Sequence, residues 1–229
     1  MLLLALRRAI KREYGPVLNY FKAFTLFLLV SITGTAIAED GGIKQVIVIG
    51  DSLSAGYRLH PSKAFPAQLQ ARLRADGLRV RIINAGVSGD TTASGLSRLE
   101  WGLADIPGGK PALAIVELGA NDALRGVEPR VTRDNLSAIL KYFAEAEIPV
   151  LLAGMQAPPN MGGPFSEEFG AIYPSLARDF DVALYPFFLD GVAARPHLNL
   201  DDGMHPNAEG VAVIVTNIAP LVKELLLKE

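Results

Sequence analysis

Two short polar segments, far apart in the chain, contain the residue types of a serine nucleophile and its base. Ser52 lies in Gly50-Asp51-Ser52-Leu53-Ser54, directly after an apolar run, and a serine hydroxyl becomes an effective nucleophile only beside a general base. Near the other end, Gly203 is one of the two residues that separate Asp202 from His205. A single turn there lets the carboxylate reach the imidazole, so these residues and Ser52 form a candidate catalytic triad.

Each half of this candidate triad also has a purely structural interpretation. A serine or aspartate that follows a strand commonly caps the next helix, and a carboxylate three residues before a histidine can cap a turn or bind a metal. The chain has three histidines, and His60 and His197 lie beside prolines in polar loops, where we interpret them as surface residues. His205 is the one with a carboxylate at a junction between loop and helix, which makes it the preferred base.

Acyl transfer to a serine also needs hydrogen-bond donors for the oxyanion that forms on the acyl carbonyl. Within residues 84–91, Gly89 can present its backbone N–H with no side chain in the way. Within Gly119-Ala120-Asn121-Asp122, the side-chain amide of Asn121 can donate a second hydrogen bond. Each residue also suits an ordinary turn, Gly89 as a turn glycine and Asn121 in an Asx-turn.

The elements that must position these residues are predicted by hydrophobic periodicity. Nearly continuous apolar runs, typical of strands buried on both faces, occur at 45–49, 80–83, 113–118, 149–153 and 182–185. Helical patterns occur at 65–75, 92–103 and 131–146, from Ser166 as a cap, and from Pro206 to Leu227. This alternation predicts an α/β fold, a three-layer α/β/α sandwich around a parallel five-stranded sheet. Ligands bind beyond the carboxyl ends of such strands, and all four polar loops fall at that edge.

The first 38 residues have the features of a secretion signal. Five basic residues precede an apolar run at 24–30, and Ala36-Ile37-Ala38 has the small-x-small pattern of a signal-peptidase site. The run is shorter than the ~20 apolar residues of a membrane-spanning helix; an uncleaved anchor is the alternative. We expect 1–38 to be a signal peptide, 39–229 to be one folded domain, and the protein to be periplasmic or secreted.

The composition excludes several classes of site and partner. The 229 residues include no cysteine, which excludes a disulfide framework, a thiolate zinc site and a cysteine nucleophile. Without residues 1–38, the chain keeps 17 basic and 23 acidic residues, a net charge of −6. An acidic domain without a basic patch argues against nucleic acid as a partner. We expect small-molecule substrates, no stable membrane insertion once the leader is cut, and a monomer.

From about Lys44 to the last helix, the chain resembles the SGNH, or GDSL-type, hydrolase family. The four sequence blocks of that family are matched in order by Gly50-Asp51-Ser52-Leu53-Ser54, Gly89, Gly119-Ala120-Asn121-Asp122 and Asp202-Gly203-Met204-His205-Pro206. Within the family, the chain is most similar to the periplasmic acyl-CoA thioesterase, lysophospholipase and arylesterase group. Ala120 departs from the family pattern by replacing a glycine. The Gly-x-Ser-x-Gly elbow of α/β-hydrolases is not met, because Ser54 stands where the second glycine belongs.

The resemblance implies a flavodoxin-like sheet and a serine hydrolase that cleaves small-molecule esters and thioesters without a metal or organic cofactor. It implies that Ser52 is the nucleophile, His205 the base and Asp202 the residue that holds the imidazole. It implies an oxyanion hole formed by the N–H groups of Ser52 and Gly89 and the side chain of Asn121. Two alternatives stay open: a carbohydrate esterase that removes acetyl groups, and a non-catalytic module that binds a ligand in the same loops. Apolar loop residues suited to an acyl chain are Leu53, Leu124, Met155, Met161 and Phe165.

Overall fold

The computed structural model describes residues 42–104, 106 and 110–228 of the chain. The predicted signal peptide, residues 1–38, lies outside the described residues. The residues from 42 onward form one unit, built around a single central sheet.

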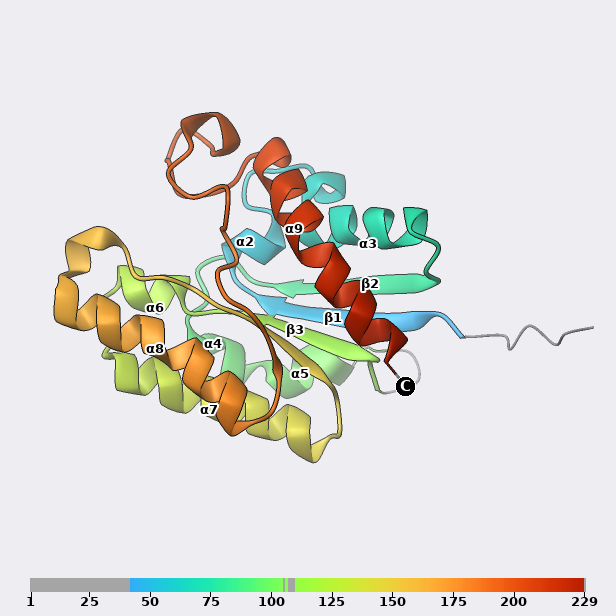
Figure 1. Cartoon of the computed structure of the whole chain (residues 1–229), viewed down its shortest axis with the longest axis horizontal. Helices are drawn as coiled ribbons and strands as arrows, with labels where there is room; N and C mark the ends of the chain where they lie inside the picture. Colours follow the sequence, from blue (N-terminus) through green and yellow to red (C-terminus); the bar gives the residue numbers. More distant parts are fainter. Residues whose placement is uncertain (1–41, 105, 107–109, 229) are drawn as a thin grey trace, which may run out of the picture. The chain divides into compact units, whose positions relative to one another are not determined.

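The sheet has five parallel strands in the order β2-β1-β3-β4-β5 (Figure 1). The strands are β1 (Lys44–Gly50), β2 (Val80–Gly86), β3 (Leu113–Glu117), β4 (Val150–Ala153) and β5 (Ala183–Tyr185). This is the flavodoxin-like order, in which the direction of winding reverses between β1 and β3. The predicted fold class, an α/β fold with a parallel five-stranded sheet, is confirmed.

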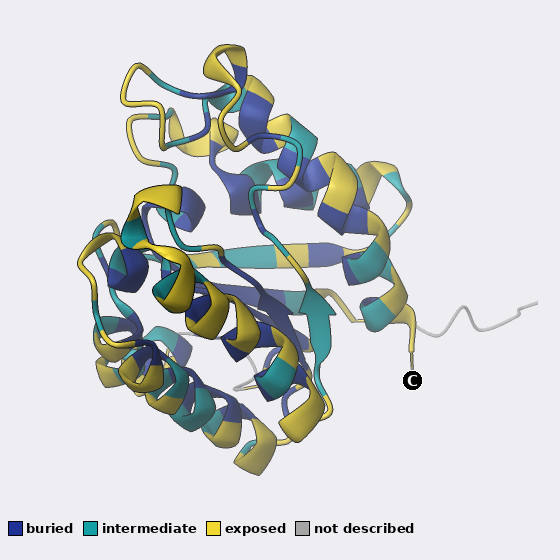
Figure 2. Ribbon diagram, turned by 60° about the vertical axis from the view of Figure 1, so that its left-hand side comes forward, coloured by how far each residue is buried: buried dark blue, intermediate teal, exposed yellow. Residues whose placement is uncertain are grey.

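Helices cover both faces of the sheet (Figures 1 and 2). On one face lie α3 (Phe65–Ala75) and α9 (Ala208–Leu227), and on the other lie α5 (Leu99–Ala104), α7 (Pro129–Glu145) and α8 (Gly163–Asp179). Three short helices follow strands or loops near the carboxyl edge: α2 (Ser52–Ala55), α4 (Thr92–Ser97) and α6 (Ala120–Leu124). Single 3₁₀ turns occur at η1 (Pro61–Lys63), η2 (Pro159–Met161) and η3 (Pro196–Leu198).

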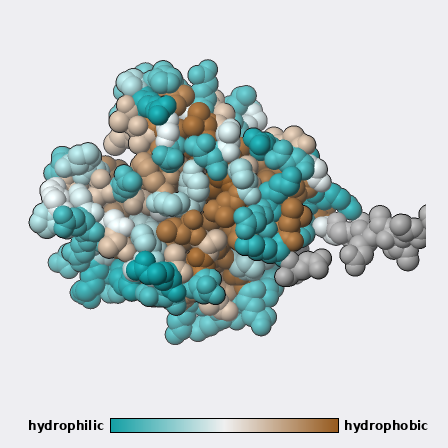
Figure 3. Space-filling view, in the orientation of Figure 1, coloured by the Kyte–Doolittle hydropathy of each residue, from teal (hydrophilic) through white to brown (hydrophobic). Residues whose placement is uncertain are grey.

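The inner strands are buried because helices pack on both of their faces. Val46 to Ile49 of β1 and all of β3 have no appreciable exposure, as the continuous apolar runs predict. The outer strand β5 is only partly buried. Figure 3 shows that hydrophobic residues are exposed in the middle of the face drawn there. The core therefore lies along β1, β3 and β4, and it fixes the positions of the loops that follow them.

The helix predicted over 92–103 is in fact two helices, α4 and α5. Arg98 separates them because its backbone leaves the helical region, with φ −110° and ψ 8°. The helix predicted to begin with Ser166 as its cap instead begins at Gly163, where Pro164 suits the first turn. The prediction missed α2 and α6, which are too short to produce a periodic pattern.

The last helix begins at Ala208, two residues later than predicted. Pro206 is paired with Asn199 in an isolated β-bridge, so it belongs to the preceding loop. The side chain of Asn207 caps α9 by accepting the N–H groups of Glu209 and Gly210. This bridge and cap hold the end of the loop that contains His205.

By length and composition alone, α9 is apolar enough to cross a membrane. One face of the helix, which includes Val211, Ile214 and Ile218, is buried against the domain, and hydrogen bonds join it to α3. Gln68 Nε2 donates to the carbonyl of Ala208 at 3.1 Å, and Lys223 Nζ donates to the carbonyl of Asp76 at 3.2 Å. We interpret α9 as a core helix that anchors the loop before it.

Candidate active site

Ser52 lies in the tight turn of residues 50–56, which follows β1 and includes α2, at the carboxyl edge of the sheet. Asp51 caps α2, and its Oδ1 accepts the N–H of Leu53 at 2.9 Å. Ser52 is therefore the first residue of the helix, and the first N–H groups of a helix have no partner within it. The helix ends after one turn at Gly56, whose φ of 83° is the left-handed conformation that favours glycine. The turn places the Ser52 hydroxyl at the ligand-binding edge.

The three residues of the predicted triad lie in a hydrogen-bonded row. Nε2 of His205 is 2.9 Å from Oγ of Ser52, although 153 positions separate the two residues. Nδ1 of His205 is 2.9 Å from Oδ2 of Asp202. The other oxygen of Asp202 accepts the backbone N–H groups of Met204 and His205 at 2.9 and 3.0 Å. Chiefly through the N–H of His205, these bonds lower the pKa of Asp202 to about 2, so this carboxylate is ionised at neutral pH.

The loop that holds His205 is closed by short backbone bonds. Leu200 N–H donates to the carbonyl of His205 at 2.7 Å, and Gly203 turns the chain with a φ of 71°. The ring of Tyr57 packs on the imidazole, with ring centroids 4.5 Å apart. These contacts restrict the orientation of the imidazole toward Ser52. His60 and His197 are exposed, as predicted, and lie outside this row.

Gly89 lies in the loop that follows β2. Its φ of 88° is strained for any residue with a side chain, which explains the glycine. Arg125 Nη2 donates to the carbonyl of Gly89 at 2.9 Å, and the N–H of Asp90 donates to the carbonyl of Val87 at 3.1 Å. The loop is therefore held by its carbonyl groups.

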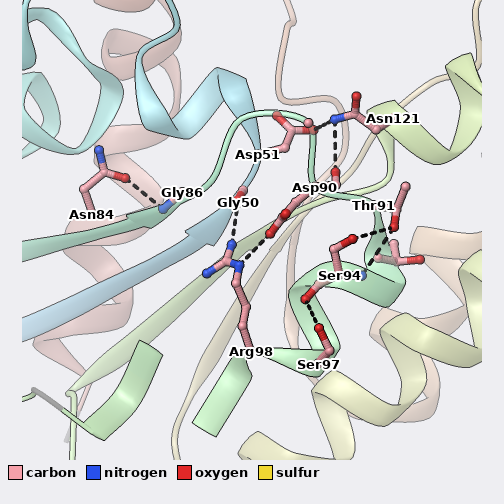
Figure 4. A network of polar contacts seen from close by, with 12 residues as sticks. Gly50, Asp51, Asn84, Gly86, Asp90, Thr91, Ser94, Ser97, Arg98 and Asn121 are labelled. Atoms are coloured by element: carbon pink, nitrogen blue, oxygen red, sulfur yellow. Dashed lines mark hydrogen bonds and ion pairs between the residues drawn. The ribbon is translucent and has the colours of Figure 1, made fainter. Parts of the chain in front are cut away.

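Asn121 lies in the first turn of α6, after β3, and reaches back toward residues 50–56, the nucleophile turn. Its Nδ2 donates to Oδ2 of Asp51 at 3.1 Å and to the backbone carbonyl of Asp90 at 3.0 Å (Figure 4). Both hydrogens of the amide are thus matched by acceptors. A hydrogen bond from Asn121 to an oxyanion would share or exchange one of them. The predicted donors from the loops after β2 and β3 lie in one connected network.

Two buried carboxyl groups beneath the nucleophile turn were not predicted as site residues. Burial is the main factor that raises the pKa of Asp51, to about 6. At the end of β3, Oε2 of Glu117 accepts the hydroxyl of Ser54 at 2.6 Å. Burial, followed by the nearby charge of Asp51, raises the pKa of Glu117 well above its ordinary value. A Cβ on Gly50 would lie 2.7 Å from Glu117 Oε2, which explains that glycine. The only charge in the apolar run 113–118 could have identified Glu117.

A pocket of about 450 Å³ opens beside Ser52 and His205. Its walls are mainly apolar, and they come from the loops that follow β1, β3, β4 and β5. Apolar side chains in these walls include Leu53, Leu124, Met155, Pro158, Phe187 and Met204. A site of this size and character suits an apolar ligand with few polar groups.

Three of the five residues that we predicted for an acyl chain, Leu53, Leu124 and Met155, line this pocket. Met161 and Phe165 are not among its lining residues. Phe165 instead stacks on Phe169 with ring centroids 5.9 Å apart, as part of the packing of α8. Among the residues that the structure describes, no group of three or more histidine, aspartate or glutamate side chains is arranged to hold a metal ion.

Comparison with known proteins gives a consistent family. The model of the GDSL-like lipase/acylhydrolase family matches residues 48–213. The chain is 39% identical over 209 residues to thioesterase 1/protease 1/lysophospholipase L1 of Escherichia coli strain K12, covering 91% of this chain and 96% of that protein. It is 41% identical over 189 residues to an arylesterase of Vibrio mimicus, covering 82% and 93% of the two chains.

Solved structures agree with the sequence comparison. The crystal structure of AlinE4, described as an SGNH-hydrolase family esterase, superposes with a TM-score of 0.69 at 49% sequence identity. The match covers 82% of this chain and 99% of that one.

Proposed function

The chain belongs to the GDSL-like lipase/acylhydrolase family, and we propose that it is a serine hydrolase that cleaves carboxylic esters and thioesters through an acyl-enzyme on Ser52. One observation carries this proposal. Two hydrogen bonds of 2.9 Å connect the Ser52 hydroxyl to the His205 imidazole and the imidazole to the Asp202 carboxylate. A hydroxyl, a base and an orienting acid in this row form the arrangement that activates a serine.

In the first half of the reaction, Oγ of Ser52 attacks the acyl carbonyl carbon while Nε2 of His205 takes the hydroxyl proton. Asp202 holds the imidazole through Nδ1 and stabilises its positive charge. As the tetrahedral intermediate collapses, the bond to the alcohol or thiol breaks and His205 delivers the proton to that leaving group. Water, deprotonated by His205, then attacks the acyl-enzyme, and the acid leaves as the proton returns to Ser52 Oγ.

The negative oxygen of each intermediate needs donors that are already in place. We assign this role to the N–H groups of Ser52 and Gly89 and to the amide of Asn121. The position of Ser52 at the start of α2 supports its part, because that amide has no partner within the helix. Asn121 lines the pocket, and its amide donates hydrogen bonds to Asp51 and to Asp90. To bind the oxyanion, the amide would share or exchange one of these two bonds.

The character of the pocket favours an acyl group as the part of the substrate that the protein binds. Its apolar side chains would contact a hydrocarbon or aryl chain, whereas a sugar ring would need more polar partners. Aryl esters, acyl-CoA thioesters and lysophospholipids all present such an acyl group. We place carbohydrate acetyl esters second for this reason.

We further propose that the enzyme acts in the periplasm or outside the cell as a monomer, after removal of residues 1–38. The basic stretch, apolar run and Ala36-Ile37-Ala38 segment support this location. Cell fractionation followed by N-terminal sequencing tests it. A mature protein that begins at Glu39 in the soluble periplasmic or secreted fraction is expected, and an intact N-terminus in the membrane fraction would contradict it.

The function is tested by assaying the purified protein on p-nitrophenyl esters of increasing chain length, acyl-CoA thioesters, a lysophospholipid and an acetylated sugar. Each assay is run with and without a serine-directed phosphonate, and the labelled residue is identified by mass spectrometry. We expect hydrolysis that the phosphonate abolishes, with the label on Ser52. Ser52→Ala should lower turnover by ~10⁴-fold or more.

Ser62 offers a matched control for this experiment. Its Oγ is also 2.9 Å from a histidine nitrogen, Nδ1 of His60, but the pair is exposed on the surface. Ser62→Ala should keep the full rate and the full label. Turnover that survives in Ser52→Ala would remove the proposed mechanism, and hydrolysis confined to the acetylated sugar would favour the carbohydrate esterase. Absence of both labelling and hydrolysis would favour a binding module.

A further inference from the structure

Arg98, at the end of α4, reaches back between two loops of the site. Its Nε is 2.5 Å from Oδ2 of Asp90, and its Nη2 donates to the backbone carbonyl of Gly50 at 3.0 Å (Figure 4). The side chains of Arg98 and Asp90 are 21% and 12% exposed. The pair is therefore largely shielded from solvent, and it is hydrogen-bonded as well as charged.

Both partners of Arg98 lie within two residues of a proposed oxyanion donor. Gly50 is the last residue of β1, two positions before Ser52, and Asp90 directly follows Gly89. The backbone carbonyl of Asp90 accepts one hydrogen of the Asn121 amide. The guanidinium of Arg98 thus connects the segments that present all three donors. It bonds directly to the nucleophile turn and to the Gly89 loop, and it is connected to Asn121 through Asp90.

The guanidinium is suited to this connection because its shape fixes two bonds in one plane. Nε and Nη2 point in set directions, so the guanidinium constrains the separation of Asp90 and Gly50 and also balances the charge of Asp90. A lysine ammonium is a point charge on a flexible stem, and it would not hold both partners in one geometry. Neither Arg98 nor Asp90 is among the described residues that line the pocket, so a bound acyl chain would not contact them.

The effect of donors in an oxyanion hole depends on the position and direction of their N–H groups. They stabilise charge that develops only in the transition state, and they do so because they are already positioned. A displacement of about 1 Å can cost ~10²-fold in rate. A side chain that fixes the separation of two donor loops should therefore affect the transition state and leave ground-state binding of the acyl chain unchanged.

We propose that Arg98 is a positioning residue of the oxyanion hole, which holds the nucleophile turn and the Gly89 loop at the separation that catalysis requires. This inference rests on the proposed function, because it assigns a role relative to the donors named there. Arg98 touches neither substrate nor the reacting atoms. Its effect passes through Gly50 and Asp90.

The experiment compares Arg98→Lys and Arg98→Ala with the full-length wild-type protein, using a p-nitrophenyl ester as substrate. Two inhibitors distinguish binding of the transition state from binding of the ground state. An acyl trifluoromethyl ketone forms a tetrahedral adduct that places an oxyanion in the hole, whereas an alkyl ether of the same chain length has no carbonyl and fills only the pocket. We expect kcat/KM to fall ~10- to 10²-fold in Arg98→Ala and by a smaller factor in Arg98→Lys. The Ki of the ketone should rise by the same factor, while the Ki of the ether stays within twofold of wild type.

Arg72 supplies the matched control. Its Nε contacts Oδ2 of Asp76 at 3.0 Å, the same pair of atoms as in Arg98 and Asp90, but on the exposed surface of α3. Arg72→Lys and Arg72→Ala should leave both inhibition constants unchanged. If Arg98→Ala does not fold, Arg98→Lys decides the question, since it keeps the charge and most of the volume.

Two results would overturn the inference: a wild-type rate and ketone affinity in Arg98→Lys, or a parallel loss of ketone and ether binding. The second would mean that Arg98 supports the pocket as a whole. Failure of the proposed function is separate, since wild-type protein would then show neither hydrolysis nor phosphonate labelling.

Discussion

Nδ2 of Asn121 lies 3.1 Å from Oδ2 of Asp51, the residue that immediately precedes the proposed nucleophile. Asp51 is fully buried, and its other oxygen accepts the N–H of Leu53. Burial of a carboxylate is unfavourable, but these two hydrogen bonds partly offset the cost. The pair connects the turn that contains Ser52 to the loop that contains Asn121. The buried Asp51 carboxyl therefore affects both the stability of the fold and the position of the proposed catalytic groups.

We predict that Asp51→Asn changes the pH dependence of stability. Because burial raises the pKa of Asp51 from its ordinary value of about 4 to about 6 in the folded protein, the folded state binds the proton more tightly than the unfolded state. Its stabilising contribution is therefore complete below about pH 4 and is lost as the pH rises through about 6. Urea unfolding between pH 4 and 8 should show the wild-type free energy of unfolding falling relative to Asp51→Asn across this window.

The exposed Asp134, which is paired with Arg130 on the surface of α7, supplies the control. Because Asp134→Asn keeps Asp51, its free energy of unfolding should fall across the same pH window as that of wild type. The buried Glu117 carboxyl acts in the same direction as Asp51 and is present in both proteins. Asp51→Asn removes one cause of its raised pKa, the nearby Asp51 charge, so this change adds to the expected difference in the same direction. A difference between wild type and Asp51→Asn that stays constant from pH 4 to 8 would contradict the raised pKa.

Asn121→Ala should lower kcat by ~10²-fold, the usual effect of removing one oxyanion donor. The fold should be kept, because the side chain is only partly buried at the surface of the pocket, but the melting temperature should fall, because Asp51 Oδ2 loses a hydrogen bond. Steady-state kinetics and a thermal melting curve measure the two effects together. A wild-type rate would remove Asn121 from the oxyanion hole and leave it as a link between Asp51 and Asp90.

Asp202→Asn should lower kcat by ~10³-fold or more with little effect on structure. The oxygen of the new amide can still accept the N–H groups of Met204 and His205, which donate to Oδ1 of Asp202 in the wild-type protein. Its NH₂ group would then face Nδ1 of His205 and favour the tautomer with the proton on Nε2. That tautomer cannot take a proton from Ser52. Asp201→Asn, at the exposed neighbouring position, should keep the wild-type kcat, and equal losses in the two variants would argue against the triad.

Gly119→Ala should destabilise the protein by about 2–4 kcal/mol. Gly119 has a φ of 115°, which is unfavourable for alanine, and an added Cβ would lie 2.1 Å from Oη of the buried Tyr173. Denaturant unfolding measures the loss. Gly170→Ala, on the exposed side of α8 with nothing near the new methyl group, should instead stabilise by ~0.5–1 kcal/mol. If Gly119→Ala is as stable as wild type, Tyr173 moves more easily than its hydrogen bond to Leu118 indicates.

The strand pattern and the ligand edge were predictable because they depend on local sequence. Continuous apolar runs such as 45–49 require burial on both faces, and alternation with helices leads to parallel strands whose carboxyl ends share one edge. The break at Arg98 was not predictable in this way. The guanidinium bonds to Asp90 and Gly50, the second of which lies 48 positions away. A local helical pattern contains no information about such a partner.

The sequence by itself determined the residue types of the site: a serine after the first strand, an aspartate and a histidine three residues apart, and a glycine and an asparagine in the loops between. It also determined that all of them belong to one edge of the sheet. Only the tertiary structure decided that Nε2 of His205 lies 2.9 Å from Ser52 Oγ and that the Asn121 amide already has two acceptors. It also decided that Phe165 stacks on Phe169 of the same helix instead of lining the pocket. The physical reason is that a hydrogen bond depends on tenths of an ångström, and these are set by how α9, α6 and β1 pack together. Segments so distant in the chain do not report their separation in their local patterns.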